Sequence, residues 1–149
     1  MLSYEKIFSR VRGKIDDPRE LSFEESILNE IYVERLHNSL GNPRIRNLFE
    51  SIQLDDENQE MSYKLRNSID DFSDDEFIIE LLAIGMIIEW LEPKVTSVKY
   101  TAPMIGGKEE KKVLDNHKNM IERLDKLKNE QKLLIRDYGY INNSYLRGV

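Results

Sequence analysis

The chain of 149 residues contains no cysteine. Disulfide bonds and thiolate groups, whether as nucleophiles or as metal ligands, are therefore excluded, and the absence fits a cytosolic protein. Histidine is scarce too, with His37 and His117 alone, and neither belongs to an HExxH-type or other catalytic pattern. We expect both histidines to be ordinary residues on helix faces.

Long apolar runs are also missing. The most apolar stretch, residues 77–91, carries Glu80 and Glu89 and is shorter than the roughly 20 residues that a membrane-spanning helix needs. The N-terminus lacks the apolar segment of a signal peptide. We therefore expect no membrane partner, and we expect residues 77–91 to form a buried helix of a single domain.

Recognisable cofactor motifs are absent as well. The acidic runs at 55–57 and 70–76 lack the alternating ligands and central glycine of a calcium loop. Gly106-Gly107-Lys108 lacks the earlier glycine and the following hydroxyl residue of a phosphate-binding loop, because Thr101 and Glu109 occupy those positions. These gaps predict no catalytic residues, no metal and no cofactor, so the chain is not expected to be an enzyme.

The charge of −6 is distributed unevenly. Residues 1–107 hold 12 Lys/Arg against 21 Asp/Glu, whereas residues 108–136 hold 9 Lys/Arg against 6 Asp/Glu. Tight DNA binding depends on neutralising phosphates with a concentrated positive face, and the sequence shows none. The asymmetry instead favours charge complementarity between neighbouring copies.

Apolar spacing predicts three helices in the first third of the chain. The first covers residues 3–14. A capping box of Ser22 and Glu25 is expected to open the second, which Gly41 would end. Asn42-Pro43 would start a third, short helix through Ile52.

The middle of the chain predicts a buried helix flanked by two possible strands. Ser73 and Glu76 form a second capping box before a helix at 74–91, which is apolar on nearly all sides and which Pro93 would end. Gly85 in its middle costs about 1 kcal/mol relative to alanine, which a close helix crossing there would offset. Weak alternation at 61–65 and 95–100 suggests two strands that could pair.

The last third predicts a long helix and a tail. Residues 108–137 carry a heptad seam along one face, and Gly139 would end the helix. The fold class is therefore mainly α, a helical bundle with a central buried helix, a long C-terminal helix, a possible two-stranded element and an extended tail. We divide the chain into a helical domain at 1–138 and a docking tail at 139–149.

The order of these parts resembles the head–tail connector proteins of tailed bacteriophages, of the helical adaptor type that sits beneath the portal. The resembling parts are the short helices at 3–52, the helix ending in EWLEP at 89–93, the loop TAPMIGGKEEKK at 101–112 and the segment IRDYGYINNSYL at 135–146. The resemblance covers nearly the whole chain and rests on layout more than on invariant motif residues.

The resemblance implies a structural virion protein without catalysis or cofactor. Adaptors of this type form a ring, usually of twelve copies, on the portal protein. The ring extends the DNA channel, lets packaged DNA pass without specific binding, and supports the stopper or tail-terminator protein. The chain would thus reside in the head–tail neck of the virion, and in the host cytoplasm during assembly.

The resemblance also implies roles for individual residues. Candidate portal-docking residues are Tyr138, Tyr140, Ile141, Tyr145 and Leu146. Candidate subunit-interface residues on the seam are His117, Met120, Leu124, Leu127, Gln131 and Leu134. Candidate residues of a loop facing the channel or the next ring are Lys99, Tyr100, Met104, Gly106 and Gly107.

Two other functions remain open at this point. One is a tail-completion or neck protein of the same particle. The other is a cytosolic assembly chaperone or regulator that binds a partner helix through the seam at 124–134.

Overall fold

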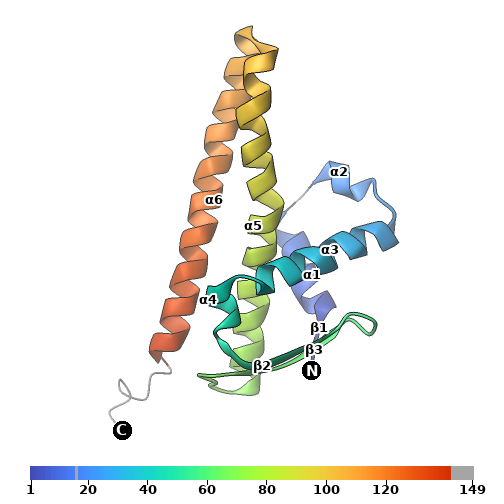
Figure 1. Cartoon of the computed structure of the whole chain (residues 1–149), viewed down its shortest axis with the longest axis vertical. Coiled ribbons are helices and arrows are strands. Elements are labelled where there is room, and N and C mark those ends of the chain that lie inside the picture. Colours follow the sequence, from blue (N-terminus) through green and yellow to red (C-terminus); the bar gives the residue numbers. More distant parts are fainter. Residues whose placement is uncertain (16, 142–149) are drawn as a thin grey trace.

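The computed structural model describes residues 1–15 and 17–141, and it is mainly helical with a small antiparallel sheet, as the sequence predicts. Its elements are β1 (Leu2–Ser3), α1 (Tyr4–Lys14), α2 (Pro18–Leu21), α3 (Glu25–Leu40), α4 (Pro43–Arg46), β2 (Phe49–Asp55), β3 (Glu60–Leu65), α5 (Asp71–Ile105) and α6 (Gly107–Ile141). Helices α5 and α6 run side by side as a long hairpin, and its far half projects beyond the other elements (Figure 1). We call the other elements together with the near half of the hairpin the head, and the projecting half the arm.

The predicted central helix forms the core of the head. Between Phe77 and Ile88 only Glu80 is not buried, because α1, α3 and α6 all pack around this part of α5. This burial removes a large apolar area from water, which is the main favourable contribution to folding.

Gly85 lies where α3 and α6 both approach α5 most closely. A Cβ atom built there would lie 1.9 Å from Ser39 Oγ and 3.4 Å from Gln131 Nε2. Ser39 is itself buried. The close crossing expected from the sequence is therefore confirmed, and it explains why a glycine stands within a buried helix.

The small sheet differs from the predicted strand pair. Its order is β1-β3-β2, all antiparallel, so the predicted strand at 61–65 is confirmed but its predicted partner at 95–100 is wrong. Residues 95–100 belong to α5 instead. The predicted third helix is also wrong beyond Arg46, since residues 49–55 form β2. A register shift between Phe49 and Ser51 sets the inward residues Phe49 and Ile52 three apart, which imitates helical spacing.

The turn between β2 and β3 is tied to the helices through Asp56. Its carboxylate accepts hydrogen bonds from the Tyr4 hydroxyl at 2.7 Å and from His37 Nε2 at 2.8 Å. The backbone N–H of Tyr4 also donates to the Gln59 carbonyl at 2.9 Å. The acidic run at 55–57 therefore has a structural use, since it fixes the hairpin turn on α1 and α3.

Helix α5 runs twelve residues past Pro93, the expected end. Proline cannot donate to the Glu89 carbonyl, yet the helix continues because α6 packs alongside it. With 35 residues each, α5 and α6 are about 52 Å long. The predicted loop at 101–112 is reduced to the turn at Gly106-Gly107, where φ angles of +72° and +67° favour glycine.

The helix ends agree only in part with the predicted capping residues. Both serine capping boxes are wrong: Ser22 Oγ donates to the Arg19 carbonyl, and Asp70 rather than Ser73 caps α5 by accepting from the Ser73 N–H at 2.7 Å. Gly41 does end α3, with φ of −72°. Gly139 does not end α6, which reaches Ile141, so the expected boundary after residue 138 lies within a helix.

Replacing Gly85 by alanine tests the crossing of the three helices. The new methyl group must displace Ser39 Oγ or the α3 backbone, so we expect the free energy of unfolding to fall by about 1–3 kcal/mol in urea titrations followed by circular dichroism. Gly13→Ala is the matched control, because nothing lies within 4 Å of a Cβ there. That control should raise stability by up to about 1 kcal/mol. Equal effects of the two substitutions would contradict the crossing.

Candidate functional site

The heptad seam of α6 faces α5 of the same chain. Leu124 and Gln131 are buried, and Met120, Leu127 and Leu134 pack half-buried against Ile84, Ile88 and their neighbours. His117 Nε2 lies 2.8 Å from the Val95 carbonyl oxygen. The predicted spacing therefore marks the face of α6 that packs on α5, and the predicted contact of these six residues with a second copy stays a prediction.

Tyr138 lies in α6 and contacts the head. Its ring stacks on Phe77 with centroids 3.9 Å apart, and its hydroxyl donates to the buried carboxylate of Asp74. Burial and this hydrogen bond raise the pKa of the Tyr138 hydroxyl above its usual value. Asp74 also accepts from the Ile69 N–H at 3.0 Å. Tyr138 therefore fixes the end of α6 to the start of α5, and its predicted role in docking on another protein stays a prediction.

The other candidate residues lie at the two ends of the hairpin. Tyr140 and Ile141 fall in the last turn of α6, and Tyr145 and Leu146 lie outside the described residues. Lys99 and Tyr100 lie in α5 near the tip. Met104 is 86% exposed beside the Gly106-Gly107 turn. The predicted tip is thus present, as a tight corner between helices rather than a loop.

A groove that the sequence did not reveal lies between α2 and α3 on one side and α5 and α6 on the other. Its hollow has a volume of about 520 Å³. It is lined by Asp17, Arg19, Glu20, Phe23, Ile31, Arg35, Glu89, Trp90, Pro93, Lys94, Ser97, Val98 and Met120. Apolar side chains and charged groups of both signs therefore share one surface.

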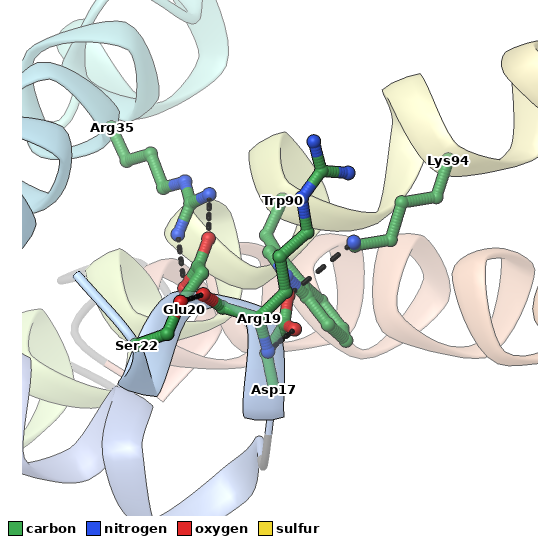
Figure 2. A network of polar contacts seen from close by, with 7 residues as sticks. All are labelled: Asp17, Arg19, Glu20, Ser22, Arg35, Trp90 and Lys94. Atoms are coloured by element: carbon green, nitrogen blue, oxygen red, sulfur yellow. Dashed lines mark hydrogen bonds and ion pairs between the residues drawn. The ribbon is translucent and has the colours of Figure 1, made fainter.

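Trp90 lines this groove and is held by Asp17. The indole Nε1–H donates to Asp17 Oδ2 at 2.8 Å, and Lys94 Nζ approaches the same oxygen at 3.3 Å (Figure 2). Lys94 and Arg123 also lie over the Trp90 ring, 5.2 and 5.5 Å from its centroid. Burial alone would raise the pKa of the Asp17 carboxyl, but the Trp90 hydrogen bond and the Lys94 charge outweigh it, so the pKa is lowered.

A second ion pair forms the neighbouring wall. The Arg35 guanidinium binds both carboxylate oxygens of Glu20, which is buried. The Arg19 guanidinium points away from both pairs (Figure 2). Across the groove, burial and the nearby Glu92 charge raise the pKa of the Glu89 carboxyl. The ion pairs near Trp90 thus join α2 and the residue before it to α3 and α5.

The groove offers a surface on which apolar and charged side chains lie together. Within residues 1–15 and 17–141, no group of three or more His, Asp or Glu side chains could hold a metal ion. None of the described helices is both long and apolar enough to cross a membrane.

Asp17 and Trp90 lie 73 positions apart, and no local pattern marks their contact. The sequence indicates only a helix stop at one and a core anchor at the other.

Comparisons with known proteins leave the family open. No protein-family model, no curated protein and no solved structure matches the chain.

Asp17→Asn tests the anchoring of the only tryptophan. The substitution removes the charge that attracts Lys94 and leaves the Trp90 N–H a neutral amide oxygen as its acceptor, so we expect a loss of about 2 kcal/mol in unfolding free energy at pH 7. A carboxyl whose pKa is lowered in the folded state stabilises above its unfolded value of about 3.9 and loses that contribution as the pH falls. The pH dependence of stability below about pH 4 should therefore be shallower in Asp17→Asn.

Trp90 fluorescence gives a direct measure of the same contact. We expect the Trp90 emission of the wild-type chain to change as the pH falls below the usual carboxyl range. Asp17→Asn should lack this pH-dependent change. Asp115→Asn, an exposed change on α6, is the control and should match wild type in both measurements. An unchanged stability and emission in Asp17→Asn would show that the carboxylate does not hold the indole.

Proposed function

We propose that the chain is a structural subunit of the neck of a tailed bacteriophage, a head–tail connector of the adaptor type. In this proposal, copies form a ring on the portal protein, extend the DNA channel and carry the stopper or tail-terminator protein. The portal would act as a template for the ring. Subunits bound side by side on it have a high effective concentration for one another, so their mutual contacts can each be weak.

The observation that supports this proposal best is the arm. The paired ends of α5 and α6 project beyond the head (Figure 1), and they carry exposed apolar side chains such as Met104, Leu114 and Ile121. A projecting helical hairpin has little core of its own. Such an element suits contact with further protein copies, because exposed apolar side chains gain from burial.

The charges are compatible with a DNA channel that does not bind DNA tightly. Residues 1–107 hold 9 more acidic than basic residues, and a surface of this sign repels phosphates. The tip at Met104, Gly106 and Gly107 would face the channel or the next ring. In the proposed channel, acidic side chains thus repel the DNA backbone, and no base sequence is recognised.

The structure changes which residues the proposal uses. Tyr138 and the seam of α6 are engaged within the chain, so portal docking is assigned to Tyr140, Ile141, Tyr145 and Leu146, and subunit contacts to the outward faces of the helices. The alternative of a chaperone that binds a partner helix through residues 124–134 loses support, because α5 already occupies that face.

Paired tyrosine substitutions test the portal contact. Tyr145→Ala should leave the unfolding free energy within about 0.5 kcal/mol of wild type and abolish copurification with the portal protein of the encoding phage. Tyr138→Ala is the matched structural control, because it removes the Phe77 stack and the Asp74 hydrogen bond. It should lower stability by about 2–3 kcal/mol. Portal binding that survives both Tyr140→Ala and Tyr145→Ala would count against the docking role.

A further inference from the structure

Helix α3 presents an outward stripe that is apolar and acidic. Phe23, just before the helix, and Ile27 are 39% and 45% exposed. Glu30 and Glu34 follow at helical spacing on the same face and are also exposed. No ion pair within the described part of the chain involves either glutamate. We call these four residues the acidic stripe.

Helix α6 presents a matching stripe that is apolar and basic. Leu114 and Ile121 are 46% and 37% exposed. Lys111 and Lys118 alternate with them on the same face, because the four residues step by three and four. Neither lysine takes part in an ion pair among residues 1–15 and 17–141. We call this set the basic stripe, and it lies beside the seam that faces α5.

No ion pair among the described residues joins the two stripes within one chain. The first half of α3 projects from one side of α5, whereas α6 lies along the other side (Figure 1). Both stripes keep their exposed apolar side chains in the folded chain. Each stripe is therefore available to another molecule.

We propose that the acidic stripe of one copy docks on the basic stripe of a second copy. The two stripes are complementary in charge, with Glu30 and Glu34 against Lys111 and Lys118, and each contributes two large apolar residues. They are also similar in length, because they cover 12 and 11 residues of the sequence, and 11 helical residues span about 15 Å. The occupant of each stripe is thus the other stripe on a neighbouring subunit.

This contact is head-to-tail, since it joins two different surfaces of identical chains. Head-to-tail contacts generate rings when the rotation closes and filaments when it does not. Two helical stripes of three turns bury less than the about 1,200–2,000 Å² of a stable complex, so a single contact is weak in solution. The inference deepens the proposed ring by naming its subunit surfaces, and it rests on the proposed function only for the ring's place on the portal.

Disulfide trapping tests the contact cleanly, because the chain has no cysteine of its own. The variant carrying both Ile27→Cys and Leu114→Cys should give a ladder of covalent oligomers on mild oxidation. Each single variant alone should remain mainly monomeric. A mixture of the two single variants should give mixed dimers above the statistical proportion and no ladder.

Charge reversal in the double-cysteine chain provides the specificity test. Lys111→Glu with Lys118→Glu should lower the ladder yield about tenfold or more, because like charges then face each other. Adding Glu30→Lys and Glu34→Lys should restore it. The matched control is Lys112→Glu with Lys126→Glu, two exposed lysines on another face of α6, which should leave the yield unchanged.

Two results would overturn the inference. One is the absence of a ladder at the highest soluble concentration and on the portal. The other is equally efficient homodimers of each single variant, which would indicate a symmetric contact or random collision. A third result separates the two proposals. If the ladder responds to the charge reversals as expected but the protein is absent from virions, the contact between the stripes stands and the proposed function does not.

Discussion

The burial of the first half of α5 is the constraint on which the rest of the structure depends. Several other parts of the head contribute a surface to the same core: α1, α3, the sheet and the near half of α6. Three helices meet at Gly85, where a Cβ would lie 1.9 Å from Ser39 Oγ. The position of α3, and with it the groove and the acidic stripe, follows from this crossing.

The same helix also joins the head to the arm. Its first half is enclosed in the head, and its second half forms the arm with α6 (Figure 1). Among the contacts that fix the hairpin are those of Tyr138 with Phe77 and Asp74 near the sheet, and that of Trp90 with Asp17 where the arm begins. The arm therefore has a defined direction relative to α3, which a ring subunit needs in order to place complementary surfaces on opposite sides.

Local patterns in the sequence were sufficient for the buried half of α5 and for the inner face of α6. Apolar residues on all sides marked α5 as buried, and steps of three and four marked the inner face of α6. Non-local contacts could not be predicted in this way. The register shift after Phe49 imitated helical spacing, and Pro93 indicated a helix end that packing against α6 overrides. Nothing local linked Asp17 to Trp90, so the groove was missed.

Quantitative peptide mass spectrometry of density-purified virions tests the central claim most directly. The account predicts this protein in the particle at a fixed ratio to the portal protein, near one to one. Its absence from particles, together with abundance in the lysate, would contradict a connector and indicate an assembly chaperone or regulator.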